Sequence, residues 1–240
     1  QTDFWTGQGR EYEDAAERIA LTKPVPRTGR RIAEIGAGFG RPGELYLGYE
    51  QIVLMDYSRT LLTSAAERWG KDPRFVFVAG NIYQLPLASQ VLDTLVMVRV
   101  MHHLADVPAA LTQLGRVTHS GSTLVIEYAN KRNLKSLMRW AARKQDWSPM
   151  EREPLEFVEL NFDFHPSWME DRFADAGLKI QKRFGVSHFR LGALKQRISP
   201  AKLAQADSLL FGVGGHIAVA PSIFVQAQCI GNAQRADVST

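Results

Sequence analysis

Short apolar runs alternate with helical stretches through the first half of the chain, and this rhythm limits the folds that the chain can adopt. Strands are expected at residues 31–35, 51–55, 75–79, 95–98 and 123–126, and helices at 42–47, 58–69 and 108–117. Strands joined by helical crossovers run parallel, and a parallel sheet is covered by helices on both faces. The pattern therefore predicts a doubly wound α/β sheet, with its ligand at the carboxyl ends of the strands.

The second half of the chain departs from this rhythm in two places. Residues 130–165 divide into a basic part and an acidic part without a clear strand, which predicts an inserted helical cap. A helix at 166–176 and strands around 178–186 and 217–226 are expected after it. About thirty residues, 188–216, separate these last two strands, so a second insertion is predicted there.

The length predicts a single domain over residues 1–230, followed by a polar tail at 231–240. Its core is expected at about 30–128 and 166–230. With 45% hydrophobic and 22% charged residues, the composition excludes collagen-like, coiled-coil and disordered classes for the whole chain. The chain begins at Gln1 rather than Met without a signal-peptide pattern, so a trimmed or disordered start is expected.

The cysteine count and the net charge limit the redox environment and the classes of partner that are expected. The single cysteine, Cys229, is expected in the last strand, and it excludes an intrachain disulfide and a cysteine-rich zinc site. No metal is therefore predicted, and a cytoplasmic location is expected. No run approaches the roughly 18 apolar residues of a membrane span. A net charge of +4 is far short of a nucleic-acid-binding signature.

A glycine-rich turn, Glu34-Ile-Gly-Ala-Gly-Phe-Gly-Arg41, follows the first expected strand. An α/β sheet presents backbone N–H groups to a ligand at this point. Arg41 stands where the third glycine of the dinucleotide pattern would be sought, which disfavours a nicotinamide cofactor. Asp56 ends the second strand, twenty residues after Gly36, and is placed to accept hydrogen bonds from both hydroxyls of a ribose. The sequence therefore predicts an adenosine-containing ligand.

These residues resemble the class I S-adenosylmethionine-dependent methyltransferases of the small-molecule, methyltransferase domain 11-like type, over about residues 30–128. That group reads E-x-G-x-G-x-G, then an acid after the second strand, then G-D-hydrophobic and L-P. This chain has Gly80-Asn81-Ile82 and Leu85-Pro86 at the last two motifs. The resemblance implies a seven-stranded Rossmann-like sheet and S-adenosyl-L-methionine as the cofactor. The cofactor-binding residues that it implies are Glu34, Gly36, Ala37, Gly38, Gly40, Asp56, Tyr57, Asn81, Ile82 and Arg99. Asn81 departs from the usual acid, although an amide oxygen still accepts from the adenine amino group.

The segment at 98–104 follows the fourth strand, where this fold presents groups to the methyl acceptor. It lacks N/D-P-P-Y and a cysteine nucleophile, which removes two nucleic-acid methylation chemistries. His102 is a candidate general base and His103 a second one, because a neutral imidazole can take a proton from a hydroxyl. Alternatively, both histidines close the strand and cap the next turn. His165 and His188 are weaker candidates for the acceptor pocket.

Two further features have both a functional and a structural interpretation. The aromatic residues Phe4, Trp5 and Tyr12 lie around the start of a helix expected at 13–20. They either fold over the cofactor, as in related methyltransferases, or pack an amphipathic helix. A basic stripe, Arg132, Lys135, Arg139 and Arg143, marks one face of an expected helix. Three interpretations of this stripe remain open. Its side chains are solvated, they pair with the acids of 151–159, or they bind an anionic substrate.

The leading hypothesis is a methyltransferase that acts on the oxygen or carbon of a small molecule, enclosed by 130–165 and 188–216. Three alternatives remain at this point: an RNA methyltransferase, a non-catalytic S-adenosylmethionine-binding module and a nicotinamide oxidoreductase. The RNA hypothesis assigns phosphate contacts to Arg132, Lys135, Arg139, Arg190, Lys195 and Arg197. Nucleic acid is disfavoured as a partner by the low net charge.

Overall fold

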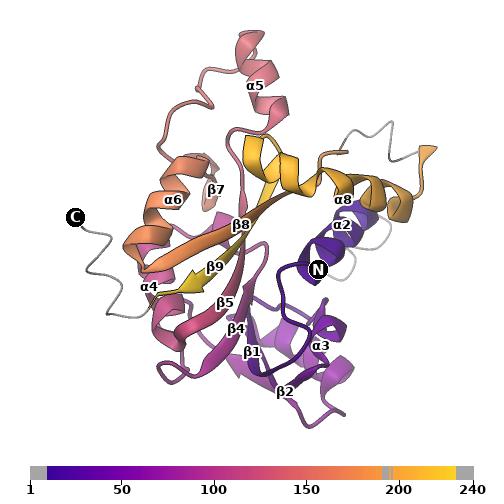
Figure 1. Cartoon of the computed structure of the whole chain (residues 1–240), viewed down its shortest axis with the longest axis vertical. Helices are drawn as coiled ribbons and strands as arrows, with labels where there is room; N and C mark the ends of the chain where they lie inside the picture. Colours follow the sequence, from indigo (N-terminus) through magenta and orange to yellow (C-terminus); the bar gives the residue numbers. More distant parts are fainter. Residues whose placement is uncertain (1–9, 191–194, 196, 231–240) are drawn as a thin grey trace.

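The computed structural model describes residues 10–190, 195 and 197–230. Its main strands are β1 (Gly29–Ile35), β2 (Tyr49–Asp56), β3 (Phe75–Ala79), β4 (Leu92–Met97), β5 (Thr118–Ala129), β8 (Leu178–Val186) and β9 (Ser222–Cys229). They form one seven-stranded sheet in the order β3-β2-β1-β4-β5-β9-β8 (Figure 1). The first five strands run parallel, and β9 runs antiparallel between β5 and β8. The predicted mostly parallel Rossmann-like sheet is confirmed, and Cys229 lies in its last strand as expected.

Helices cover both faces of this sheet. They are α2 (Glu11–Thr22), η1 (Gly43–Tyr46), α3 (Arg59–Trp69), η2 (Met101–His103), α4 (Val107–Val117), α5 (Leu134–Ala141), α6 (Pro166–Asp175) and α8 (Pro200–Ile217). Side chains alternate along β1, so Ile32 packs with α2, α3 and α8, whereas Ala33 and Ile35 pack with α4 and α6. Figure 1 shows α4 and α6 on one side of the sheet and α2 and α8 on the other.

Local sequence signals fix several helix ends. The Ser58 side chain accepts a hydrogen bond from the Leu61 N–H at 3.4 Å and begins α3. Asp106 caps α4 in the same way, accepting from the Ala109 N–H at 2.9 Å. Gly177 follows α6 with a φ of +71°, a conformation that favours glycine. The helices predicted at 58–69, 108–117 and 166–176 are therefore present with nearly the expected bounds.

Two predicted elements differ from the structure in type or extent. The segment expected as a helix at 42–47 is the 3-10 helix η1, and it lies tightly under the Trp69 ring. A Cβ built on Gly43 would lie only 2.6 Å from Cε2 of Trp69. The last strand begins at Ser222 rather than near 217, because α8 continues to Ile217 and closes at Ala218, with φ +53°.

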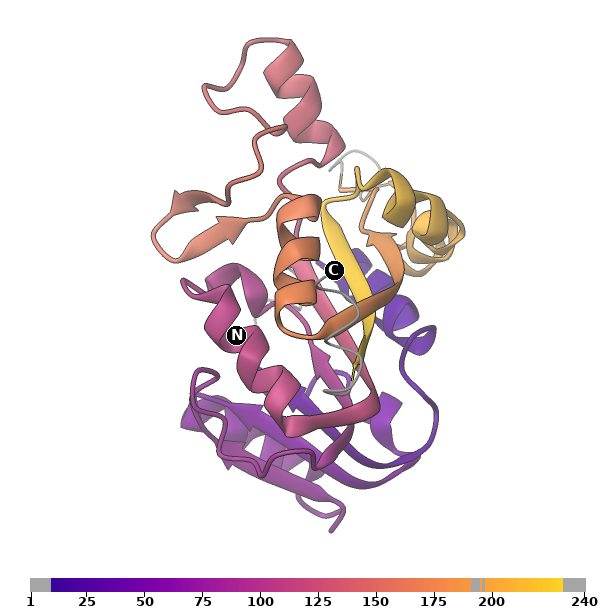
Figure 2. The same ribbon diagram turned by 60° about the vertical axis from the view of Figure 1, so that its left-hand side comes forward.

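The cap at 130–165 contains the expected helix, α5, together with an antiparallel hairpin that the charge pattern did not indicate. The hairpin is formed by β6 (Leu155–Val158) and β7 (Asn161–Asp163), with Leu160 in the left-handed region at the turn. The expectation of no strand in this segment is therefore wrong, because backbone pairing forms these short strands despite their acidic side chains. Figure 2 shows α5 and the hairpin extending beyond the sheet.

The second predicted insertion, 188–216, consists largely of α8 within the described residues. Leu203, Ala204 and Phe211 of this helix are buried against the sheet together with α2. The segment therefore covers one face of the core rather than adding only an enclosure for the acceptor. Among the residues that the structure describes, no helix is long and apolar enough to cross a membrane.

Candidate active site

The glycine turn leaves β1 at the carboxyl edge of the sheet. Gly36, Gly38 and Gly40 have φ values of +77°, +55° and +68°, which glycine adopts without a steric penalty. A Cβ built on Gly36 would lie 2.0 Å from Cγ2 of Val100, so the chain needs glycine there. At Gly38 the nearest atom to such a Cβ, Cδ1 of Leu61, is 3.9 Å away. Gly38 therefore has more space beside its backbone than Gly36 or Gly40.

Asp56 holds this turn against the start of α3. Its Oδ2 accepts from the Gly38 N–H at 2.7 Å, and its Oδ1 accepts from the Ser58 N–H at 2.8 Å. The residue is only 5% exposed. Each carboxylate oxygen has a second lone pair, so Asp56 can hold the turn and still accept from a ribose hydroxyl. A hollow beside it is lined by Tyr57, Arg59, Ala79, Gly80 and Asn81.

Two residues expected at the adenine lie on the turn after β3. Asn81 is exposed, and its Oδ1 accepts from the Tyr83 N–H at 2.9 Å. That oxygen was expected to accept from an adenine amino group, and one of its two lone pairs is used within the turn. Ile82 is half-buried against the core beside it. The adenine contacts of both residues stay predictions.

Glu34 is buried in β1, below the glycine turn. Burial raises the pKa of its carboxyl to about 8, although the charge of Arg41 opposes this shift. Its Oε2 has no hydrogen-bond partner in the described part of the chain. Glu34 is therefore mostly protonated at neutral pH, and it presents an unsatisfied polar atom beneath the predicted cofactor site.

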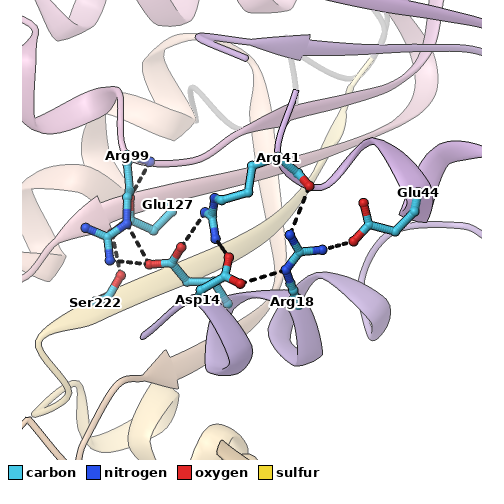
Figure 3. Close-up of polar contacts among 8 residues, drawn as sticks. Asp14, Arg18, Arg41, Glu44, Arg99, Glu127 and Ser222 are labelled. Carbon is cyan, nitrogen blue, oxygen red and sulfur yellow. Dashed lines mark hydrogen bonds and ion pairs between the residues drawn. The ribbon is translucent and has the colours of Figure 1, made fainter. Parts of the chain in front are cut away.

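A network of charged side chains fastens α2 across the glycine turn. Glu17 lies at its centre, 1% exposed. Its Oε1 accepts from Nε of Arg99 at 2.7 Å, and its Oε2 lies 2.6 Å from Nη2 of Arg41. Asp14 binds Arg41 and also Nε of Arg18 at 2.9 Å. Figure 3 shows the two arginines reaching from separate turns toward the acids of α2.

The same network continues into β5 and β9 (Figure 3). The Arg99 N–H donates to Oε2 of Glu127 at 2.8 Å, and the Ser222 hydroxyl donates to the other oxygen of Glu127. Burial raises the pKa of Glu127. Arg99 was predicted to contact the cofactor. Its guanidinium pairs with Glu17 instead, and its backbone N–H donates to Glu127. Sequence reasoning missed both acids; the one local signal for them is Arg41, a cation directly after Gly40 that needs an acidic partner when it is buried.

His102 and His103 lie in η2, after β4, on the side where the sequence predicted the acceptor. Burial lowers the pKa of His102 to about 4, and the neighbouring His103 and Arg99 add to this effect. Its imidazole is therefore neutral over the ordinary pH range. His103 is exposed, and its Nδ1 lies 3.2 Å from the carbonyl oxygen of Leu160. This contact joins η2 to the β6–β7 hairpin.

Asp163 ends β7 and was not singled out from the sequence. The next residue, Phe164, donates its N–H to the Ala129 carbonyl at 2.9 Å and accepts from the Lys131 N–H at 3.0 Å. These bonds hold Asp163 at the carboxyl end of β5, and β7 also packs against η2. Burial raises the pKa of Asp163 to about 6, although the charge of Arg190 opposes the shift. Its carboxylate makes no hydrogen bond to any described residue.

The other candidates from the sequence have structural contacts. His165 caps α6, its Nδ1 accepting from the Ser167 N–H at 3.2 Å. His188 lies 2.6 Å from the buried Asp207. Lys195, one of the residues assigned to RNA phosphates, pairs with Glu13. Phe4 and Trp5 lie outside the described residues. Tyr12 belongs to α2, and its hydroxyl accepts from the Phe189 N–H at 3.0 Å.

Comparisons with known proteins point to one class. A family model described as "Methyltransferase domain" matches residues 33–126, which include the glycine turn and Asp56. A demethylmenaquinone methyltransferase from Thermobifida fusca is 32% identical over 102 residues, covering 41% of this chain and 43% of that protein. The chain spans less than half the length of the curated relatives that it matches first.

Solved structures share the fold at low identity. A chain of the Haloferax volcanii complex that contains the Trm112 methyltransferase activator superposes with a TM-score of 0.65 at 14% identity, covering 96% of this chain and 98% of that one. An S-adenosylmethionine-dependent methyltransferase from Mesorhizobium loti gives 0.61 at 16% identity, covering 90% and 99%. The sheet order, the glycine turn and the family match over residues 33–126 indicate a class I S-adenosylmethionine-dependent methyltransferase domain, to which this part of the chain is similar. S-adenosylmethionine is the cofactor of this class.

The residues present fit that cofactor. The space beside Gly38 leaves its backbone accessible to a ligand, and Asp56 retains lone pairs for a ribose. The hollow along Tyr57 and Asn81 extends this site toward the expected adenine position. Among the described residues, no group of three or more His, Cys, Asp or Glu side chains is arranged to hold a metal ion.

Proposed function

We propose that the protein transfers a methyl group from S-adenosylmethionine to an oxygen or carbon atom of a small molecule. When bound, this cofactor supplies an electrophilic methyl group on a positively charged sulfur. Asp56 would hold the ribose, and the backbone around Gly38 would border the methionine part. The residues named for cofactor binding from the sequence, from Glu34 to Arg99, stay proposals for individual contacts.

The observation that carries the proposal is the hairpin over the acceptor side. Its strand β7 packs on η2 and on the end of β5, so the chain itself covers the region that follows β4. Residues 155–163 contain Glu156, Glu159 and Asp163 but no basic residue. Such a cover repels a phosphate backbone and suits a small acceptor, which supports the small-molecule hypothesis over RNA.

Two groups on this side are candidates to take the proton of the acceptor. Asp163 is a mostly buried carboxyl with a pKa of about 6, so it is largely ionised at neutral pH. His102 is neutral, but its pKa of about 4 makes it a weaker base. We infer that Asp163 is the better base and that His102 positions the acceptor. Either group would take the proton of the acceptor O–H or C–H; the acceptor atom would then bond to the methyl carbon while the sulfur–methyl bond of the cofactor breaks, which leaves S-adenosylhomocysteine.

The test is transfer of a labelled methyl group by the purified chain. S-adenosylmethionine with a tritiated methyl group is incubated with small hydroxyl and carbon acceptors and, separately, with RNA. The first acceptor to try is demethylmenaquinone, because the Thermobifida fusca relative is named for it. Label in a small molecule is the expected result. Label only in RNA would contradict the proposed acceptor class, and cofactor binding without any transfer would favour a non-catalytic module.

A further inference from the structure

Helix α5 stands outside the layers of the fold. In Figure 1 it lies at the end of the molecule opposite β2, and Figure 2 shows it above the hairpin. Its base is firmly attached, because the Leu134 N–H donates to the Val219 carbonyl at 2.8 Å and Nδ2 of Asn130 donates to the Ala218 and Ala220 carbonyls. Asn133 caps the helix, accepting from the Ser136 N–H at 3.0 Å. The arrangement presents a fixed helix to its surroundings.

One face of α5 is apolar and uncovered within the described structure. Leu134 is 57% exposed, Met138 64% and Trp140 46%. At about 100° per residue, these side chains fill one continuous arc together with Leu137 and Ala141. An amphipathic helix ordinarily turns this face toward a core. Here the face points away from both core clusters, to which none of its residues belongs.

The opposite face and the following turn are basic. Lys135 and Arg139 are one helical turn apart, Arg143 and Lys144 follow the helix, and all four are exposed. Residues 130–145 contain no acid. The acids of 151–159 do not neutralise these cations, since no ion pair joins them in the described structure. The positive charge of this segment is therefore available to an anionic surface.

We propose that α5 docks the protein on an anionic lipid surface. A helix with Leu, Met and Trp on one face and Lys and Arg on the other lies in the plane of the bilayer interface, with its apolar side inserted. Anionic headgroups then attract Lys135, Arg139, Arg143 and Lys144. A nucleic acid would use the cations and leave Leu134 and Met138 in water, so it fits the helix less well.

The β6–β7 hairpin carries exposed apolar side chains near the acceptor side, but its acids Glu156 and Glu159 keep it outside the surface that docks on anionic lipid. Phe157, Val158 and Leu160 are 56%, 60% and 51% exposed, and the Leu160 carbonyl contacts His103. A protein docked on the membrane through α5 would thus hold η2 close to apolar acceptors in the lipid. This last step rests on the proposed function, whereas docking itself does not.

The test is flotation of the full chain with lipid vesicles, without cofactor or acceptor. Vesicles of phosphatidylcholine with roughly 30 mol% phosphatidylglycerol should bind the protein about tenfold or more tightly than pure phosphatidylcholine. The double variant Lys135→Glu/Arg139→Glu and the single variant Met138→Asp should each lose about tenfold or more of this binding. Leu209→Asp is the matched control, because Leu209 is an apolar residue on α8 that is 83% exposed. It should bind as the wild type does.

Several outcomes would overturn the proposal. Equal binding of both vesicle types, or equal loss in Leu209→Asp, would show that α5 is not the docking element. A wild-type dimer that Met138→Asp converts to a monomer, without vesicle binding, would assign the face to a second copy. Binding of a single-stranded RNA probe that the double variant loses, again without vesicle binding, would assign the cations to RNA. None of these measurements depends on turnover, so failure here leaves the methyltransferase proposal standing.

Discussion

Replacing Glu17 with glutamine tests the charged network that joins α2 to the cofactor edge. The carboxylate is 1% exposed and contacts both Arg41 and Arg99, at 2.6 Å and 2.5 Å. Removing one partner of a buried ion pair costs about 3–5 kcal/mol of unfolding free energy. Arg41 keeps Asp14 as a partner, and the two arginine side chains are 13% and 24% exposed. These features reduce the expected loss to about 2–3 kcal/mol.

Urea unfolding followed by circular dichroism measures this loss as a lower midpoint at unchanged slope. For a domain of this size, the melting temperature should fall by about 4–12 °C. Asp171→Asn is the matched control, because Asp171 and its partner Arg152 are 50% and 56% exposed, and such a pair contributes about 0–1 kcal/mol. If Glu17→Gln unfolds at the same urea concentration as this control, the network does not stabilise the fold as argued.

Three further predictions concern titratable groups. If Asp163 is the base, kcat/KM of the wild type should rise with pH through about 6, as its carboxyl loses its proton. Asp163→Asn should lose activity and should no longer show this rise. A rise through about pH 6 that persists in the variant would exclude Asp163 as the base. If His102 takes the proton instead, His102→Ala should lower kcat by about 10²–10⁴-fold without weakening cofactor binding. A variant that turns over as fast as the wild type would exclude His102 as the base. The pKa of Glu34 is about 8 in the folded protein against a reference value of 4.5, so the folded state binds an extra proton between these values. Its contribution to stability should be complete below pH 4.5 and be lost as pH rises through about 8. Urea unfolding of Glu34→Gln should lack this part of the pH dependence, and an unchanged dependence would contradict the buried, protonated state.

The cofactor edge was predictable because its signals are local. Glycines with positive φ, a carboxylate at the end of the next strand and a serine cap must lie within a few residues of one another for the turn to form. Gly38, Asp56 and Ser58 are accordingly joined by backbone-to-side-chain hydrogen bonds. The alternation of apolar runs likewise indicated the parallel strands, since each buried strand needs a continuous apolar segment.

The acceptor side was less predictable because its contacts are long-range. Asp163 reaches the end of β5 only through the backbone bonds of Phe164, and no spacing in the sequence announces this pairing. Glu17 contacts Arg99, which lies 82 residues later in the sequence. From the sequence alone, Glu17 could not be told from any other polar residue of a helix. The β6–β7 hairpin was missed for a related reason. The division of this segment into a basic and an acidic part predicted a helical cap, whereas strand pairing satisfies the backbone whichever side chains the strands carry.

The central claim is that the glycine turn and Asp56 form an S-adenosylmethionine site, and titration calorimetry tests it most directly. S-adenosylmethionine and S-adenosylhomocysteine should bind the purified chain, whereas NAD should not. Asp56→Ala should weaken S-adenosylmethionine binding by about 1–3 kcal/mol, the range for hydrogen bonds to a charged group. Asp171→Asn, far from the turn in sequence and exposed, should bind as the wild type does. Binding of NAD, or the same S-adenosylmethionine affinity in Asp56→Ala and wild type, would contradict the assigned site.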